Sequence, residues 1–234
     1  MRLIIASLLL ACTLAPSALA QDFDRGMAAY LAFDFQTAMN EWLPLAKQGN
    51  ARAQVRIGAM YHFEQGVPRD YAEAARWYRL AAEQGYAEAQ YMLGSMYMKG
   101  GGLPQDDAEA ARWTRLAAEQ EYAKAQHRLG VMYIYGEGVP QSDAEAVRWY
   151  RLAAQQGSYF AQAGLGSMYE NGRGVQQDDI AAHMWYDIAS ENGFPDGQAA
   201  VWRANVAAKM SAADIAEARR RARACMTSGY TDCN

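Results

Sequence analysis

The chain has 234 residues, and its 22 lysines and arginines against 26 aspartates and glutamates give a formal net charge of −4 at pH 7. A sequence pI near 5.4 offers no basic surface for a phosphate backbone, so we expect no nucleic-acid partner. The one basic run, Arg219-Arg220-Arg221 with Arg223, falls in the last turns of a predicted helix, where cations complement the helix dipole.

Residues 1–20 have the pattern of an export signal. Arg2 precedes an apolar run from Leu3 to Leu14, and Ala18-Leu19-Ala20 forms a small-x-small cleavage motif. We expect cleavage after Ala20 and a periplasmic or secreted protein. The alternative is a lipoprotein anchored at Cys12, with Leu9-Leu10-Ala11-Cys12 as the lipidation box. No later segment approaches the roughly 18 apolar residues of a membrane span, so we expect no transmembrane segment.

Residues 21–49 predict a short N-terminal helical hairpin. It includes Trp42-Leu43-Pro44-Leu45-Ala46 and ends in Gln48-Gly49.

Residues 50–193 contain four copies of one unit. The pair Met-Tyr recurs every 36 residues, at 60, 96, 132 and 168, each time two residues after a glycine. A fixed period of this length indicates stacked supersecondary units, each too small to bury its own apolar face. Function must therefore be sought on a repeated surface.

Each unit predicts two helices. In the first, for example residues 87–99, apolar residues are spaced three and four apart. Glycine in the middle of a helix costs about 1 kcal/mol relative to alanine, so its recurrence predicts close approach of a neighbouring helix. Gly-Val-Pro or similar loops follow, and Asp70, Asp106, Ser142 and Asp178 are predicted N-caps of the second helix.

The second helix repeats a tryptophan at one position, and we expect these four rings in the core rather than in an aromatic binding site. Arginines recur on the opposite face. We expect each to pair with a glutamate one turn away, as in Glu73 with Arg76 and Arg79 with Glu83, which gives a solvated and neutralised face.

This pattern resembles the Sel-one-like repeat, a variant of the tetratricopeptide repeat. The residues that support the resemblance are Ala89-Gln90, Leu93-Gly94, Met96-Tyr97, Gly102-Leu103-Pro104-Gln105-Asp106, Ala110-Ala111, Trp113 and Ala117-Ala118-Glu119-Gln120 with their counterparts. The resemblance implies an all-α fold, a right-handed α-solenoid of stacked helix-turn-helix repeats, in which the first helix of each unit lines the concave face.

Residues 194–234 predict capping helices and a tail closed by a disulfide. Trp202 stands where a glycine is due, and Ser211-x-x-Asp214 opens the last helix. Terminal units with a polar outer face keep solenoids soluble. Cys225 and Cys233 are the only cysteines after residue 20, and an exported protein favours their pairing. The alternative is two free thiols in a frayed tail.

The concave face predicts a binding strip. If the recurring glycine faces the neighbouring helix, the positions six and three before it and one, four and five after it face the groove. Several of these are large or charged and differ between copies. The partner-binding candidates are Phe63, Tyr91, Met98, Lys99, His127, Ile134, Tyr135, Phe160 and Glu170. We expect a peptide segment or helix of a partner there, oriented by Lys99 and Glu170. The alternative is that flanking helices bury most of these side chains.

No catalytic or cofactor motif is present. The chain lacks Ser-x-x-Lys, Gly-x-Ser-x-Gly, phosphate-loop and dinucleotide motifs. His62, His127 and His183 have no second ligand at metal spacing. We expect no enzyme, no cofactor and no metal, but a monomeric interaction scaffold or adaptor of the cell envelope. The alternatives are a secreted factor that binds a host protein, and a hydrolase of peptidoglycan-like or β-lactam compounds.

Overall fold

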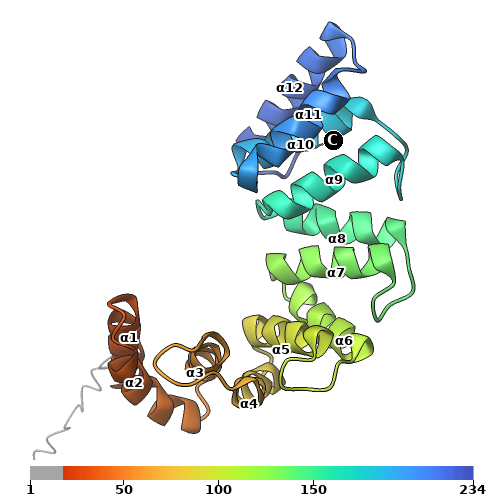
Figure 1. The fold of residues 1–234 in the computed structure, drawn as a ribbon. Coiled ribbons are helices and arrows are strands. Elements are labelled where there is room, and N and C mark those ends of the chain that lie inside the picture. Colours follow the sequence, from red (N-terminus) through yellow and green to blue (C-terminus); the bar gives the residue numbers. More distant parts are fainter. Residues whose placement is uncertain (1–17, 234) are drawn as a thin grey trace, which may run out of the picture.

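The computed structural model describes residues 18–233 of the chain. Successive helices form hairpins that follow one another along a curved array (Figure 1). The helices are α1 (Ala18–Leu31), α2 (Phe35–Lys47), α3 (Ala51–Phe63), α4 (Tyr71–Glu83), α5 (Ala87–Lys99), α6 (Asp107–Glu119), α7 (Ala123–Tyr135), α8 (Asp143–Gln155), α9 (Tyr159–Asn171), α10 (Asp179–Glu191), α11 (Gln198–Ala207) and α12 (Ala212–Thr227), with a 3₁₀ turn at Pro195–Gly197 before α11. Residues 1–17, which include Cys12 and most of the predicted export signal, lie outside the described residues.

The fold class predicted from the repeat is confirmed. Between residues 18 and 233 there is no β-strand, and each helix from α1 to α10 packs on the next one along the chain. At the C-terminal end α10 also packs on α12, which closes the array. The chain is therefore an α-solenoid.

The predicted N-caps of the second helices are all present. Asp106 Oδ1 accepts a hydrogen bond from the Glu109 amide at 3.0 Å, and Asp70, Ser142 and Asp178 cap α4, α8 and α10 in the same way. The preceding helices α3, α5, α7 and α9 each end at a residue in the left-handed conformation. Each hairpin bend is thus set by local backbone chemistry.

The recurring glycine marks a close helix contact, as predicted. A Cβ added at Gly130 would lie 2.6 Å from the Tyr150 ring, and one at Gly94 would lie 2.7 Å from Thr114 Oγ1. In both cases the obstructing side chain belongs to the second helix of the same hairpin. Glycine therefore lets the two helices of a unit approach until a side chain of the second fills the space over the first.

The four repeated tryptophans are core residues, as expected. Trp77 is 4% exposed, and it packs in a cluster with residues of α2 and α3 rather than with its own hairpin alone. Arg76 pairs with Glu73 at 2.9 Å and also lies over the Trp77 ring, and the next two units repeat both contacts. The tryptophans thus bury the apolar face between successive units.

One predicted ion pair does not form. Arg79, which we expected to pair with Glu83, instead donates to the Tyr97 hydroxyl at 2.9 Å. Arg115 and Arg151 donate in the same way to Tyr133 and Tyr169. The reason is the stacking of units, which places the tyrosine of the next first helix closer to the guanidinium than the glutamate one turn along. This arginine therefore joins neighbouring units.

A buried glutamine joins units inside the core. Gln126 is 2% exposed; its amide donates to the Ala118 carbonyl at 3.2 Å, and its oxygen accepts from Gln156 Nε2 at 2.8 Å. Gln54, Gln90 and Gln162 make equivalent bonds in the other units. Each glutamine links the last turn of the preceding hairpin to the end of its own. We call this repeated arrangement the glutamine ladder.

The C-terminal tail caps the glutamine ladder. In the last unit Asn192 takes the place of the donating glutamine and bonds Gln162 Oε1 at 2.8 Å. The Tyr230 hydroxyl in turn donates to Asn192 Oδ1 at 2.8 Å. Cys225 and Cys233 form the predicted disulfide, which keeps the segment around Tyr230 against α12. The tail thus completes the hydrogen bonds of the last repeat.

Substituting the recurring glycine should destabilise the protein. Gly130→Ala gains up to about 1 kcal/mol of helix propensity but overpacks the Tyr150 ring, which costs about 1–3 kcal/mol. We expect a net loss of about 1–2 kcal/mol in the free energy of unfolding, measured by urea denaturation. Gly101→Ala is the control because nothing lies within 4 Å of its added Cβ. Equal stability of Gly130→Ala and wild type would contradict the contact.

Breaking the glutamine ladder should also be costly. Gln126→Met keeps the volume but leaves the buried Ala118 carbonyl without its side-chain donor, so we expect a loss of about 1–3 kcal/mol. Thermal unfolding of this variant should be compared with that of Gln155→Met, an exposed neighbour of the ladder. If the two variants unfold at the same temperature, the ladder does not stabilise the fold.

Candidate peptide-binding groove

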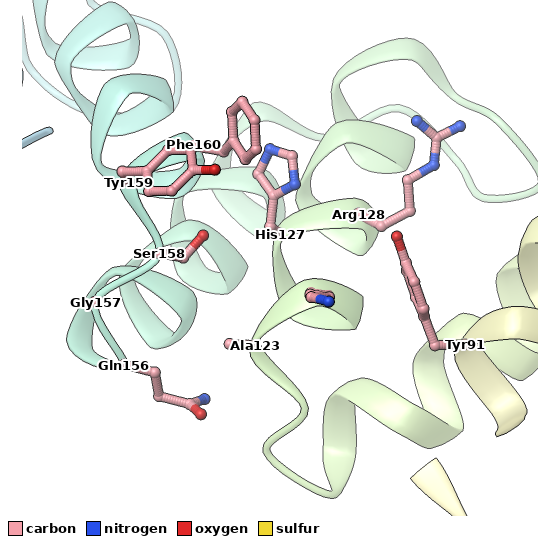
Figure 2. A pocket seen from close by; sticks show the side chains of 10 residues that line it. Tyr91, Ala123, His127, Arg128, Gln156, Gly157, Ser158, Tyr159 and Phe160 are labelled. Atoms are coloured by element: carbon pink, nitrogen blue, oxygen red, sulfur yellow. The ribbon is translucent and has the colours of Figure 1, made fainter. Parts of the chain in front are cut away.

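A hollow of about 490 Å³ opens where the first helices of three successive units meet. The lining side chains come from α5, from α7 and from the start of α9 with the turn before it. They are Tyr91, Ala123, Lys124, His127, Arg128, Gln156, Gly157, Ser158, Tyr159 and Phe160. Figure 2 shows Tyr159 and Phe160 at one end of this hollow, Tyr91 and Arg128 at the other, and His127 between the two ends. This volume lies in the range typical of ligand sites.

Repeat geometry places these residues together. Tyr91 and His127 occupy the position three before the glycine of their units, and Lys124 and Phe160 the position six before it. These positions lie in the first half of each helix and on one face. Stacking of α5, α7 and α9 then aligns them into a shared wall.

An aromatic stack forms the centre of that wall. The His127 imidazole stacks with the rings of Tyr150 and Phe160, with ring centroids 5.7 Å from each and interplanar angles of 16° and 29°. Burial, with a smaller contribution from the Arg128 charge, lowers the pKa of His127 to about 4. At neutral pH this imidazole is therefore uncharged and contributes a flat, largely apolar surface.

The wall continues into a second hollow of about 410 Å³. Phe160 lines both hollows and lies 5.5 Å from the Phe194 ring, which in turn lies 5.2 Å from the Trp202 ring. The remaining lining residues are Ala163, Gly164, Ser167, Glu170 and Tyr186. We call the two hollows together the groove.

The structure brings four of the predicted residues into the groove. Tyr91, His127 and Phe160 line the first hollow, and Phe160 and Glu170 line the second. Phe160 is 46% exposed, so nearly half of this residue is accessible to solvent. The Glu170 carboxylate already accepts from the Tyr186 hydroxyl at 3.0 Å and pairs with Lys209 at 3.4 Å. Its predicted role in orienting a partner remains a prediction.

The other five predicted residues lie outside both hollows. They occupy the positions four and five after the glycine, at the far end of each first helix. Met98 and Ile134 are half-buried against core clusters, as the alternative of burial by flanking helices anticipated. Phe63, Lys99 and Tyr135 are exposed and line neither hollow.

Several groove residues were not predicted as contact residues. Arg128 lies two before the glycine, a position that the sequence analysis did not assign to the groove, and Tyr159 lies seven before it. Phe194 and Trp202 belong to the irregular segment after the repeats. The break in the repeat at Trp202 was the one available signal that a large ring replaces the small packing residue.

The groove is lined mainly by aromatic rings and a few charged side chains. Among residues 18–233, no three His, Cys, Asp or Glu side chains come together as metal ligands. Within the same residues, no helix is both long enough and apolar enough to cross a membrane. His62, His127 and His183 lie on α3, α7 and α10.

His127 should titrate near pH 4 in the folded protein, because burial disfavours the charged imidazolium and the Arg128 charge repels it. The folded-state pKa is below the ordinary value of 6.5, so His127 contributes stability above pH 6.5 that is lost as the pH falls from 6.5 towards 4. The Cε1 proton, followed by NMR and assigned with His127→Asn, measures the midpoint. A midpoint near 6.5 would show that the imidazole is solvated and outside the stack.

Comparison with known proteins identifies the repeats. The family model described as Sel1 repeat, the Sel-one-like repeat of the sequence analysis, matches residues 51–86, 87–122, 123–158 and 160–194. No curated protein sequence is significantly similar to this chain.

Two solved structures share the fold. A Sel1 repeat protein from Oxalobacter formigenes is 38% identical, with a TM-score of 0.72 over 78% of this chain and 74% of that one. The protein c5321, a protective antigen of uropathogenic Escherichia coli strains displaying an SLR fold, is 42% identical, with a TM-score of 0.65 over 66% of this chain. The match spans only 33% of the length of c5321. The chain belongs to the Sel1 repeat family.

Proposed function

We propose that this protein is a non-catalytic interaction scaffold that holds a peptide segment or helix of a partner protein in the groove. Repeats of this family generally serve as protein-interaction scaffolds. The observation that supports the groove as the binding site is its aromatic wall, in which Tyr91, His127 and Phe160 come from three successive units and line one hollow.

The exposure of Phe160 in this wall favours a macromolecular partner. Large aromatic rings at the surface of a protein mark contact sites, because their burial releases water from a large apolar area. Phe160 separates two hollows, of about 490 and 410 Å³. A partner segment could fill each hollow with a large apolar side chain and cover Phe160 between them. Central, well-packed aromatic contacts of this kind dominate the binding energy of interfaces.

Export to an oxidising compartment is part of this proposal. The Cys225–Cys233 disulfide supports it, since such bonds persist outside the cytosol. An adaptor in the cell envelope and a secreted protein that binds a host protein both fit this compartment. We favour the envelope adaptor.

Selection of ligands tests the groove. Peptides selected from a phage-displayed random library against the wild-type protein should bind with apolar side chains that need Phe160. Phe160→Ala removes a central aromatic contact, for which we expect a loss of about 2 kcal/mol, or roughly thirtyfold in Kd. Fluorescence anisotropy with a synthetic copy of the selected peptide measures this change.

The matched control is Leu31→Ser on α1, which alters another exposed apolar side chain far along the chain from the groove. It should bind like wild type, and circular dichroism should show both variants folded. Peptides that bind Phe160→Ala and wild type equally would place the binding surface elsewhere and contradict the proposal.

A further inference from the structure

The repeats provide an internal comparison of charge along the groove face. Between the first and second units, Arg56 lies two before its glycine and Glu88 six before the next one. Arg56 Nη2 donates to both carboxylate oxygens of Glu88, at 2.9 and 3.0 Å, and this ion pair joins α3 to α5. At this step of the solenoid the two charges neutralise each other.

The same two positions are not neutralised one unit further along. Lys124 occupies the position of Glu88, six before the glycine. The residue two before the glycine of the preceding unit, which is Arg56 at the earlier step, is here the uncharged Met92. Lys124 is exposed and forms no ion pair with any residue between 18 and 233. The third unit thus places an unneutralised ammonium group at the edge of the first hollow.

Arg128 adds a second cation. Arg128 occupies the position of Arg56, two before the glycine. The residue of the next unit that would face it, at the position of Glu88, is Phe160, so Arg128 has no carboxylate there. Arg128 reaches Glu137 at 3.2 Å instead, and its side chain remains 27% exposed. One lobe of the guanidinium is therefore paired while the residue still lines the hollow.

The first hollow is accordingly positive in a negative protein. Its lining contains two cations and no carboxylate, whereas the whole chain has a net charge of −4. His127 adds no charge at neutral pH, because burial lowers the pKa of its imidazole to about 4. Apolar rings meet the exposed Lys124 ammonium and the partly neutralised Arg128 guanidinium at one place, which is complementary to an anionic group beside a large apolar one.

We propose that the occupant of the groove is an acidic peptide segment, in which an aspartate or glutamate pairs with Lys124 while an adjacent large apolar side chain packs between Tyr91 and Phe160. This inference rests on the proposed function and adds the chemistry of the partner to it. The exposed Lys124 gives the groove its preference for an acidic peptide, and the charge of Arg128 strengthens this preference.

The test uses the peptides selected on the wild-type protein. Their sequences should be enriched in Asp and Glu next to an aromatic or aliphatic residue. Two synthetic peptides, one selected sequence and its copy with Asn or Gln for each Asp or Glu, are then measured against wild type and Lys124→Gln. An exposed ion pair contributes up to about 1 kcal/mol, so Lys124→Gln should weaken the acidic peptide up to about fivefold and leave the neutral one unchanged.

Lys124→Glu should weaken the acidic peptide further, because two like charges then meet. Lys47→Gln, which removes an exposed lysine from α2, is the control and should bind both peptides like wild type. Binding of the acidic peptide should also decline with added salt more steeply than binding of the neutral one.

Four results would count against the inference. Selected peptides without acidic enrichment, or an equal effect of Lys124→Gln on both peptides, would overturn it while leaving the groove as a binding site if Phe160→Ala still weakens binding. Loss of the Phe160 dependence itself would instead remove the proposed function. Concentration-dependent self-association that Phe160→Ala abolishes, measured by sedimentation equilibrium, would assign the groove to a second copy of this chain.

Discussion

The buried glutamine of each unit is the constraint on which the groove depends. Gln126 is fixed by the Ala118 carbonyl of the preceding hairpin and by the Gln156 amide of its own hairpin. The next two residues along α7 are His127 and Arg128. Gln90 stands in the same relation to Tyr91. A buried amide that lost these partners would cost about 1–3 kcal/mol, so rotation of a first helix about its axis is opposed. The hydrogen bonds of the buried glutamines therefore fix the direction in which the groove side chains point.

Stability and recognition therefore use different positions of the same unit. Glycine, tryptophan and glutamine fill equivalent places in every copy and determine how hairpins stack. The residue two before one glycine and the residue six before the next are Arg56 and Glu88, which neutralise each other, at the first step of the solenoid. They are Met92 and Lys124 at the second step and Arg128 and Phe160 at the third, and neither of these is an ion pair. Substitutions there alter charge and shape without altering the stacking. A solenoid can thus vary its binding surface while keeping its fold.

The fold was predictable from sequence because the information for it is local and repeated. Helix caps, loops and the small packing residue each appear four times, and the structure confirms them. The groove was predicted only in part. Tyr91, His127 and Phe160 followed from helical spacing, but Arg128 and Phe194 depend on how far neighbouring hairpins rotate and on the irregular segment after α10. The hydrogen bond from Arg79 to the Tyr97 hydroxyl, which replaces the expected ion pair with Glu83, likewise depends on contacts between units. The sequence of one unit does not encode these contacts.

The central claim is that the aromatic wall on the first helices, with its unneutralised cation, is the binding surface. The most direct measurement is an NMR titration of protein carrying ¹³C-labelled aromatic side chains with an acidic peptide selected on the wild-type protein. We expect the resonances of Tyr91, His127 and Phe160 to shift together and saturate at one Kd, while the resonances of Trp77 and Trp113 between the units do not move. Saturable shifts confined to the second helices, with Tyr91 and Phe160 unchanged, would contradict it.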